Sequence, residues 1–265
     1  MVAVKFLETI KDGKRVERFE KEVEILRSIN HPHVIKILDL GEFGRQSDPI
    51  RFFVMEYQPR NLQREIGAHP RGLHPDIVLP LCMQMGSALA SVHEKDIAHR
   101  DLKPSNVLFD GTNVKIADFG IARYSGSEGV REGITGDGER VAPRYYMSPE
   151  QWRWWKKKSD EHPGKESDVY QFGLIMYQLM TGYNPNTVWR WRDDEKPKED
   201  AVSQILTSMS GSLANDVAGL VREMLAPSKA DRPSMAQVQE RLLGSFRSYS
   251  SHYSALYGVQ PGREY

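Results

Sequence analysis

The stretch His99-Arg100-Asp101-Leu102-Lys103-Pro104-Ser105-Asn106 decides the fold of this chain, together with Asp118-Phe119-Gly120, which begins twelve residues after Asn106. The first stretch brings a carboxylate, an amine and an amide into one short loop. A second carboxylate, that of Asp118, follows the strand-like run Val114-Lys115-Ile116-Ala117. A single motif of three residues would indicate little, but both stretches at this spacing predict a catalytic site rather than an ordinary polar loop.

Phosphoryl transfer from ATP requires this set of groups. In this order and spacing, the residues resemble the catalytic core of the protein kinase superfamily. The resemblance implies that Asp101 takes the proton of the acceptor hydroxyl and that Lys103 stabilises the γ-phosphate. It also implies ATP and Mg²⁺ as cofactors, with Asn106 and Asp118 as the metal ligands.

Residues expected to surround the nucleotide lie on both sides of this loop. Val2-Ala3-Val4-Lys5 is similar to the strand whose lysine grips the α- and β-phosphates in this superfamily. Residues 51–57 resemble the last small-lobe strand running into the hinge, where Met55 guards the back pocket and the following backbone contacts adenine. The cofactor-binding set implied by the resemblance is Lys5, Glu22, Ala3, Met55, Glu56, Gln58, Leu108 and Asp118.

A helix between these two strands is predicted to hold the nucleotide-binding lysine. Residues 15–29 carry apolar side chains close to helical spacing, with charges between them. The dipeptide His31-Pro32 ends this helix, because proline restricts the residue before it. Family spacing counted back from that dipeptide selects Glu22 as the partner of the lysine, with Glu20 and Glu24 as solvated neighbours.

Three later motifs follow in the order of the superfamily. Ser148-Pro149-Glu150 resembles the motif that closes the activation segment, and the apolar run from Asp168 to Met180 suits a helix buried on all sides. Asp231-Arg232-Pro233 is similar to the site of a late arginine, which predicts an ion pair between Arg232 and Glu150. An aspartate before an apolar helix is by itself most often a cap.

The resemblance implies an α+β, two-lobed protein-kinase-like fold, with a truncated small antiparallel-sheet lobe and a mainly helical large lobe. The expected parts are the small lobe and hinge in residues 1–58, the large lobe in 59–247 and a flexible C-terminal tail in 248–265. The small lobe is expected to have three strands, at residues 2–7, about 34–40 and about 50–56. The side chains expected to stack into the apolar column that aligns the lobes are His99, Phe119, Leu26 and Ile37.

No glycine-rich turn that would cover the ATP phosphates precedes Val2, where the superfamily has two further strands. We expect these strands to have been lost upstream, because every later motif is intact. A pseudokinase or scaffold acting by protein binding is the rival interpretation, and a small-molecule phosphotransferase of similar fold is a third. The four retained side chains of the nucleotide and catalytic sites favour a catalyst.

The catalytic loop and the activation segment indicate which hydroxyl accepts the phosphate and how activity is regulated. Lys103-Pro104-Ser105 favours serine or threonine as acceptor, whereas Pro143 stands where serine/threonine kinases usually carry threonine. In the superfamily, an arginine such as Arg100 receives an activation-segment phosphate. Family spacing places that phosphate near Glu139, whose carboxylate is a candidate mimic, and the phosphorylation candidates are Ser125, Ser127 and Thr135.

Composition limits the remaining function classes. Lys plus Arg and Asp plus Glu number 36 each, so charge does not indicate nucleic acid or an anionic membrane as partner. The sequence predicts no membrane segment and no signal peptide. The single cysteine, Cys82, lies in an apolar stretch and is expected in the core. These features favour a reducing cytoplasm, and the resemblance to protein kinases implies protein substrates.

The stretch Trp152–Lys158 combines three tryptophans with one arginine and three lysines. It is a candidate docking surface for a protein partner, because tryptophan beside basic residues is typical of interface hot spots. Alternatively, the tryptophans pack beneath the activation segment. The sequence does not separate these two interpretations.

Overall fold

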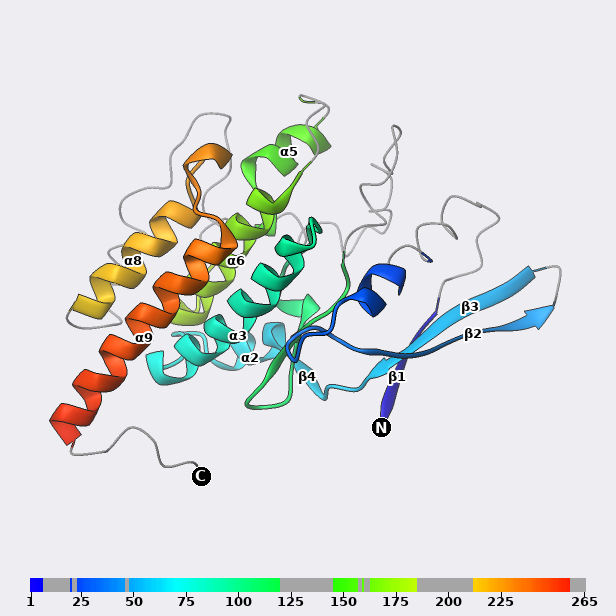
Figure 1. Cartoon of the computed structure of the whole chain (residues 1–265), viewed down its shortest axis with the longest axis horizontal. Coiled ribbons are helices and arrows are strands. Elements are labelled where there is room, and N and C mark those ends of the chain that lie inside the picture. The colour runs from blue at the N-terminus through cyan, green and yellow to red at the C-terminus, as the bar shows by residue number, and fades with distance from the viewer. Residues whose placement is uncertain are drawn as a thin grey trace.

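The structure is a computed structural model that describes residues 1–6, 20, 23–45, 48–119, 145–156, 159, 163–184 and 212–257. A three-stranded sheet lies at one end of the molecule and the long helices pack together at the other (Figure 1). Predictions that lie outside the described residues concern Glu22, Ser125, Ser127, Thr135, Glu139, Pro143, Lys157, Lys158 and residues 258–265.

The small lobe is an antiparallel sheet with the strand order β1-β3-β2. Its strands are β1 (Val2–Phe6), β2 (Ile37–Arg45) and β3 (Asp48–Glu56). The three predicted strands are confirmed, but β2 begins at Ile37 rather than near residue 34. Val34 instead forms a parallel bridge with Ile116 of the large lobe, and the N–H of Ile35 donates to the carbonyl of Ile116 at 2.9 Å.

The register of the sheet places the expected nucleotide-facing residues together. Ala3 pairs with Met55 and Lys5 pairs with Phe53. Because side chains alternate along a strand, Ala3 and Lys5 share one face of β1. They are half-buried, whereas Val2, Val4 and Phe6 on the other face are exposed.

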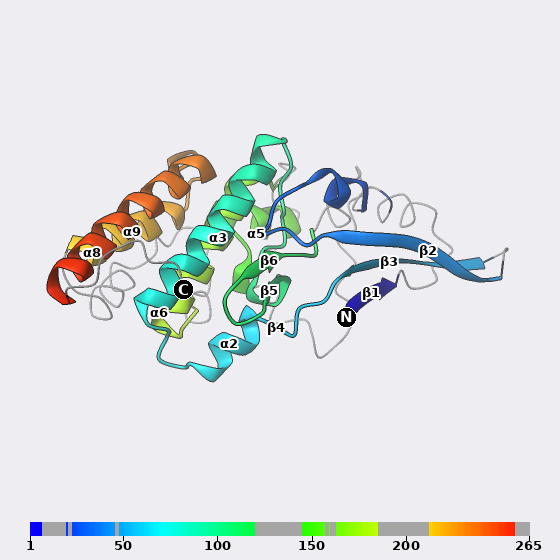
Figure 2. The ribbon, with the colours of Figure 1, turned by 60° about the horizontal axis from the view of Figure 1, so that its bottom comes forward.

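A helical segment at residues 23–28 lies beside this sheet (Figure 2). Val23 and Leu26 are buried, and their separation of three residues puts them on one face of the helix. The N–H of Ile29 still donates to the carbonyl of Leu26 at 3.3 Å, and His31-Pro32 follows. The predicted end of the helix is therefore confirmed.

The large lobe is mainly helical, as predicted. Its helices are α2 (Leu62–Ala68), α3 (Pro75–Glu94), α5 (Pro149–Trp155), α6 (Lys165–Thr181), α8 (Ser212–Met224) and α9 (Met235–Tyr257). Helix α6 packs against α3 and α8, and α9 covers α3 and α8 (Figure 1). Every residue of α6 from Ser167 to Met180 is buried, which confirms a helix enclosed on all sides, although it begins at Lys165 rather than at Asp168.

Helix α3 is the one helix in the described part of the chain that is long and apolar enough, by length and composition, to cross a membrane. Half of its apolar window is buried inside the fold, against α9 and α6. Nine of its residues, including Cys82, are buried, so α3 is placed as a core helix of the large lobe.

A second, small sheet has the order β4-β5-β6 and carries the catalytic stretch. Its strands are β4 (Arg60–Asn61), β5 (Val107–Phe109) and β6 (Val114–Ile116). The outer residues of β5 and β6 are buried and the middle ones half-buried. Anchoring both strands in the core fixes the loop that precedes β5 and the residues that follow β6.

The last helix corrects the predicted C-terminal boundary. Helix α9 continues to Tyr257, so residues 248–257 are helical rather than the start of a flexible tail at 248. No glycine or proline occurs between Gly244 and Gly258. Nothing in that stretch therefore stops a helix already fixed by its buried residues Val238 and Leu242.

Candidate active site

The catalytic loop gathers the three predicted side chains. Lys103 Nζ lies 3.1 Å from Asp101 Oδ2. Asn106 Nδ2 donates to the carbonyl of Asp101 at 2.8 Å and to Asp101 Oδ2 at 3.2 Å. The short 3₁₀ helix η1 (Pro104–Asn106), with proline at its first position, turns the chain so that Asn106 faces back toward Asp101.

Lys5 reaches Asp118 from the small lobe. Its Nζ lies 2.9 Å from Asp118 Oδ1, although 113 residues separate the two. The ammonium also stands 5.6 Å from the centre of the Phe53 ring. The side chains of Lys5 and Asp118 are 34% and 46% exposed, so the pair lies open to a ligand rather than sealed in the core.

Two residues of this site have backbone angles that non-glycine residues seldom adopt. Arg100 has φ of 67° and Asp118 has φ of 58°. Such angles cost roughly 1–3 kcal/mol each and persist only where surrounding contacts hold them. The strain sits directly before Asp101 and at the predicted metal ligand.

Asp168 supplies the contacts that hold the loop. Its fully buried carboxylate accepts the N–H of His99 at 2.7 Å, the N–H of Arg100 at 2.6 Å and Nε2–H of His93 at 2.8 Å. The sequence predicted Asp168 only as a helix start. A carboxylate at the head of an apolar helix was the available signal, because a buried charge requires several donors.

A chain of glutamine side chains also holds the loop and was missed by sequence analysis. Gln151 Nε2 donates to the carbonyl of Arg100 at 2.7 Å, and Gln171 Nε2 donates to Gln151 Oε1 at 3.1 Å. The N–H of Leu102 donates to Gln171 Oε1 at 3.0 Å. Helices α5 and α6 thereby fix the backbone on both sides of Asp101.

The predicted apolar column is partly observed. The rings of His99 and Phe119 lie 4.6 Å apart, and Phe119, Leu26 and Ile37 are buried in one core cluster. His99 Nε2–H donates to the carbonyl of Ala117 at 3.0 Å, and Nδ1 accepts the N–H of Asp101 at 3.2 Å. Burial lowers the pKa of His99, which favours this neutral form despite the nearby carboxylates.

The residues predicted to contact adenine lie at the end of β3, just after it, and in β5. Met55 and Leu108 are half-buried and pack against the core, and Gln58 is half-buried in the connection after β3. The N–H of Glu56 donates to the carbonyl of Lys36 at 3.2 Å.

Lys115 of β6 joins this hinge to two other segments and was not predicted. Its Nζ lies 2.7 Å from Glu56 Oε2 and donates to the carbonyl of Pro32 at 2.9 Å. The hinge end of β3, the loop after the 23–28 helix and the strand leading to Asp118 therefore meet at one ammonium group.

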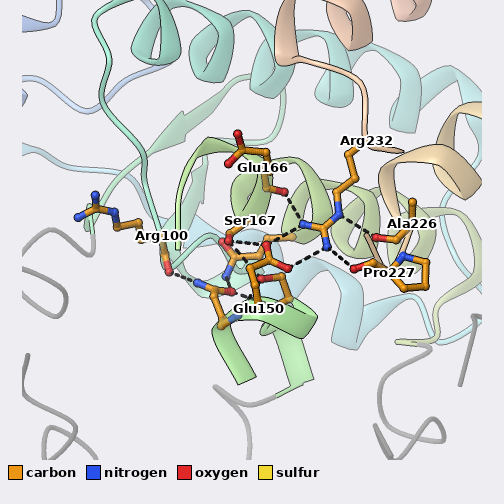
Figure 3. A network of polar contacts seen from close by, with 10 residues as sticks. Arg100, Glu150, Glu166, Ser167, Ala226, Pro227 and Arg232 are labelled. Atoms are coloured by element: carbon orange, nitrogen blue, oxygen red, sulfur yellow. Dashed lines mark hydrogen bonds and ion pairs between the residues drawn. The ribbon is translucent and has the colours of Figure 1, made fainter. Parts of the chain in front are cut away.

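The predicted pair of Glu150 and Arg232 is confirmed (Figure 3). Arg232 Nη1 and Nη2 donate to the two carboxylate oxygens at 2.7 and 2.9 Å, and both side chains are buried. The remaining N–H groups of the guanidinium donate to carbonyls, those of Ala226, Glu166 and Pro227.

Burial alone would raise the pKa of Glu150, but the hydrogen bonds and charge of Arg232 outweigh it and lower that pKa. Ser167 Oγ also donates to Glu150 Oε1 at 2.7 Å. The ion pair fixes the start of α5 against α6, next to the glutamine chain that reaches the catalytic loop.

The three tryptophans of α5 differ in exposure. Trp154 is 5% exposed and packs inward. Trp152 and Trp155 are half-buried, and Lys156 is exposed. One tryptophan is therefore packed within the fold and two are partly accessible. Packing beneath the activation segment stays a prediction, because residues 120–144 lie outside the described part of the chain, and docking stays a prediction as well.

The oxygen donors present suit magnesium. Asn106 and Asp118 offer an amide oxygen and a carboxylate, which are ligands that Mg²⁺ accepts together with substrate phosphates and water. No cluster of three or more His, Cys, Asp or Glu side chains suited to a metal occurs among the described residues. A metal ion that completes its coordination shell with phosphate oxygens does not need a cluster of three protein side chains.

The fold and these side chains define the catalytic domain of a nucleotide-dependent phosphotransferase. A sequence profile of the protein kinase domain matches residues 1–242, and the chain belongs to that family. It is 35% identical over 187 residues to the serine/threonine-protein kinase PrkC of Bacillus subtilis, covering 69% of this chain and 27% of PrkC.

Two further relatives show the same likeness. PknB of Mycobacterium tuberculosis, a serine/threonine-protein kinase, is 33% identical over 190 residues, 70% of this chain and 29% of PknB. A probable serine/threonine-protein kinase of Corynebacterium efficiens is 33% identical over 244 residues, 87% of this chain and 35% of that protein. The chain thus spans about a third or less of the length of these curated relatives.

Proposed function

We propose that this domain transfers the γ-phosphate of ATP to serine or threonine hydroxyls of protein substrates. The observation that carries the proposal is the convergence of Asp101, Lys103 and Asn106 in one loop, with the Lys5–Asp118 pair contributed from outside it. The names of the relatives support serine or threonine as the acceptor, as does Lys103-Pro104-Ser105.

Each side chain has a role that its position supports. Asp101 accepts the proton of the substrate hydroxyl, and Lys103, 3.1 Å from it, adds positive charge beside the transferred group. Asn106 is oriented by the two hydrogen bonds that its Nδ2 donates to Asp101, and its amide oxygen, 3.5 Å from Ser105 Oγ, is the atom that would bind Mg²⁺. Bound Mg-ATP supplies the phosphoryl group and the charge neutralisation that the protein lacks.

Lys5 and Asp118 complete the proposed nucleotide site. An ammonium and a carboxylate 2.9 Å apart provide a cation for the phosphates and an anion for the metal. Since both are partly exposed, nucleotide binding replaces a solvated ion pair and does not have to break a buried one. We further propose that the stretch Trp152–Lys158 contacts a protein partner.

The test separates chemistry from binding. Asp101→Asn keeps the shape of the side chain but removes the base, so transfer to a serine peptide falls by roughly 10²- to 10⁴-fold while Mg-ATP affinity is retained. Asp118→Asn lowers the Mg²⁺-dependent affinity of the protein for ATP. Asp216→Asn, at an exposed position of α8, is the control and leaves both unchanged.

Phosphoamino acid analysis of the labelled product identifies the acceptor. Radioactive phosphate on serine or threonine supports the proposal, and label on tyrosine alone contradicts the acceptor assignment. Unchanged transfer in both the Asp101 and the Asp118 variants would contradict the catalytic assignment as a whole.

A further inference from the structure

The outer face of helix α5 carries an aromatic and basic surface that the proposed chemistry does not use. The rings of Trp152 and Trp155 lie 5.2 Å apart. Lys156 Nζ stands 5.0 Å from the centre of the first ring and 4.9 Å from that of the second. These three residues share one side of the helix, because positions three and four apart are neighbours on its surface.

The opposite side of α5 is firmly fixed. Trp154 and Gln151 are buried there, and Glu150 is bound by Arg232. Ser148 and Gln151 form a capping box at the start of the helix. The outer face is consequently presented by a rigid support, and a rigid surface loses little conformational entropy when a partner binds.

The charge of this face is positive. Arg153 and Lys156 are exposed, and Lys157 and Lys158 follow in the sequence. The one acidic residue of α5, Glu150, is buried and paired with Arg232, so it does not offset them. A local excess of positive charge in a chain whose formal net charge is 0 selects for an acidic partner.

Helix α5 also contacts the catalytic loop, through its buried side. Gln151 of α5 donates to the carbonyl of Arg100 at 2.7 Å, and Arg100 directly precedes Asp101. Helix α5 begins at Pro149, immediately after the described residues 145–148 that leave the activation segment. Because α5 contacts the residue before Asp101 with one side and is exposed on the other, its outer face is close enough for a substrate segment distant from the phosphorylated residue to reach it.

We propose that Trp152, Arg153, Trp155 and Lys156 form a docking surface for an acidic segment of the protein substrate, separate from the residue that is phosphorylated. This inference rests on the proposed function and specifies its substrate class. The ammonium of Lys156, already held over two indole rings, meets a carboxylate without a large loss of side-chain freedom. Arg153 adds a second charge-assisted hydrogen bond, and the tryptophans contact the apolar parts of the segment.

The experiment uses two fluorescent peptides with the same serine acceptor, one carrying a run of four glutamates on one side of the acceptor and one carrying glutamines instead. A second pair of peptides carries the four glutamates or glutamines on the other side of the serine acceptor. Binding is measured by fluorescence anisotropy without ATP, so it does not depend on catalysis. The protein variants are Arg153→Gln with Lys156→Gln, and the control Arg222→Gln, whose arginine is exposed on α8.

We expect wild-type protein to bind one glutamate peptide at least tenfold more tightly than its glutamine counterpart, and the preference to shrink as salt rises. The double variant reduces the preference for the glutamate peptide to less than threefold, with an unchanged melting temperature. The Arg222 variant retains the full preference. In kinetics, the double variant raises KM for the acidic peptide and leaves kcat unchanged.

Equal binding of glutamate and glutamine peptides by wild-type protein overturns the proposal, as does a preference that survives in the double variant. Self-association that the double variant abolishes, without any peptide preference, assigns the face to a second copy and also overturns it. If the peptides bind as expected but no phosphate is transferred, the docking surface stands and the proposed function fails.

Discussion

The carboxylate of Asp168 accepts the main-chain N–H of Arg100 at 2.6 Å across 68 residues of sequence. The same side chain accepts the N–H of His99 through its other oxygen at 2.7 Å. Arg100 has φ of 67°, so one buried carboxylate in the first turn of α6 holds a strained residue directly beside the proposed base. The position of Asp101 therefore depends on a residue that never meets the substrate.

Asp168→Asn tests that dependence. An amide has one acceptor oxygen and an NH₂ group that faces the backbone donors, so at least one charge-assisted hydrogen bond is lost. We expect the free energy of unfolding to fall by roughly 1.5–3 kcal/mol for each lost bond. Transfer should slow through kcat rather than through KM for ATP, as measured by steady-state kinetics and urea unfolding. Asp216→Asn serves as the exposed control, and a fully active Asp168 variant would contradict the positioning role.

Arg232→Met tests the buried ion pair. Removing the guanidinium leaves Glu150 charged and buried, and we expect the free energy of unfolding to fall by about 3–5 kcal/mol. Arg241 and Glu223 form the matched exposed pair, with Arg241 Nη2 at 3.1 Å from Glu223 Oε1. Because exposed pairs contribute about 0–1 kcal/mol, Arg241→Met should change the melting temperature little.

The double change Glu150→Gln with Arg232→Met removes the buried carboxylate that Arg232→Met alone leaves without its ion-pair partner. It should be less destabilising than Arg232→Met alone, since a neutral amide is less costly to bury than a carboxylate. Equal losses in the buried and exposed arginine variants would show that the ion pair is not what stabilises this region.

Stability should depend on pH through His99. Burial lowers the pKa of His99 below its ordinary value of 6.5, so between the folded pKa and 6.5 the unfolded chain binds a proton that the folded chain does not. The free energy of unfolding is therefore greatest above pH 6.5 and falls by about 1.4 kcal/mol per pH unit as the pH drops through that window. Protonation at Nδ1 would also remove the acceptor of the Asp101 N–H.

Urea unfolding between pH 5 and 7.5 measures this slope. The pKa of His31 is also lowered, first by burial and then by the charges of His33 and Lys115, so it adds a slope of the same sign. His99→Phe should reduce the slope without abolishing it. The lowered pKa of Glu150 acts only below its ordinary value of 4.5, outside the measured window. An unchanged slope in the variant would contradict the assignment to His99.

Cys82 should be inert in the folded protein. It is fully buried in α3, and burial raises the pKa of its thiol well above the ordinary value of 9.0. As the thiolate is the reactive form, a disulfide reagent such as DTNB should label native protein only at the rate of unfolding. Addition of denaturant should release one thiol per chain, the number that the sequence contains. Rapid labelling of native protein would place Cys82 outside the core.

Much of the fold follows from patterns that are local in sequence. The resemblance of Val2-Ala3-Val4-Lys5 to a strand of the superfamily predicts a strand, in which Ala3 and Lys5 share one face because successive side chains point to opposite sides. The apolar run to Met180 predicts an enclosed helix, because no polar face is left for solvent. The order of the short motifs predicts Asp101, Lys103, Asn106 and Asp118 as one site.

Boundaries were less well predicted where a long-range contact overrides local pattern. Residues 34–36 fit a strand by composition, but their hydrogen bonds connect with Ile116 and Glu56 instead of extending β2. Residues 248–257 fit a polar tail by composition, yet the packed helix before them continues to Tyr257. Local propensity is a weak determinant compared with tertiary contacts, so neighbouring structure determines the conformation of both stretches.

The sequence by itself determined which residue types carry the chemistry and which segments are buried, because both depend on the identity and spacing of nearby residues. Only the tertiary structure decided which partners those residues have. Asp168 with Arg100, Gln151 with Gln171, and Lys115 with Glu56 join segments far apart in the chain. A buried or half-buried polar side chain signals in sequence that it needs a partner, but the choice of partner is made when the helices and strands pack.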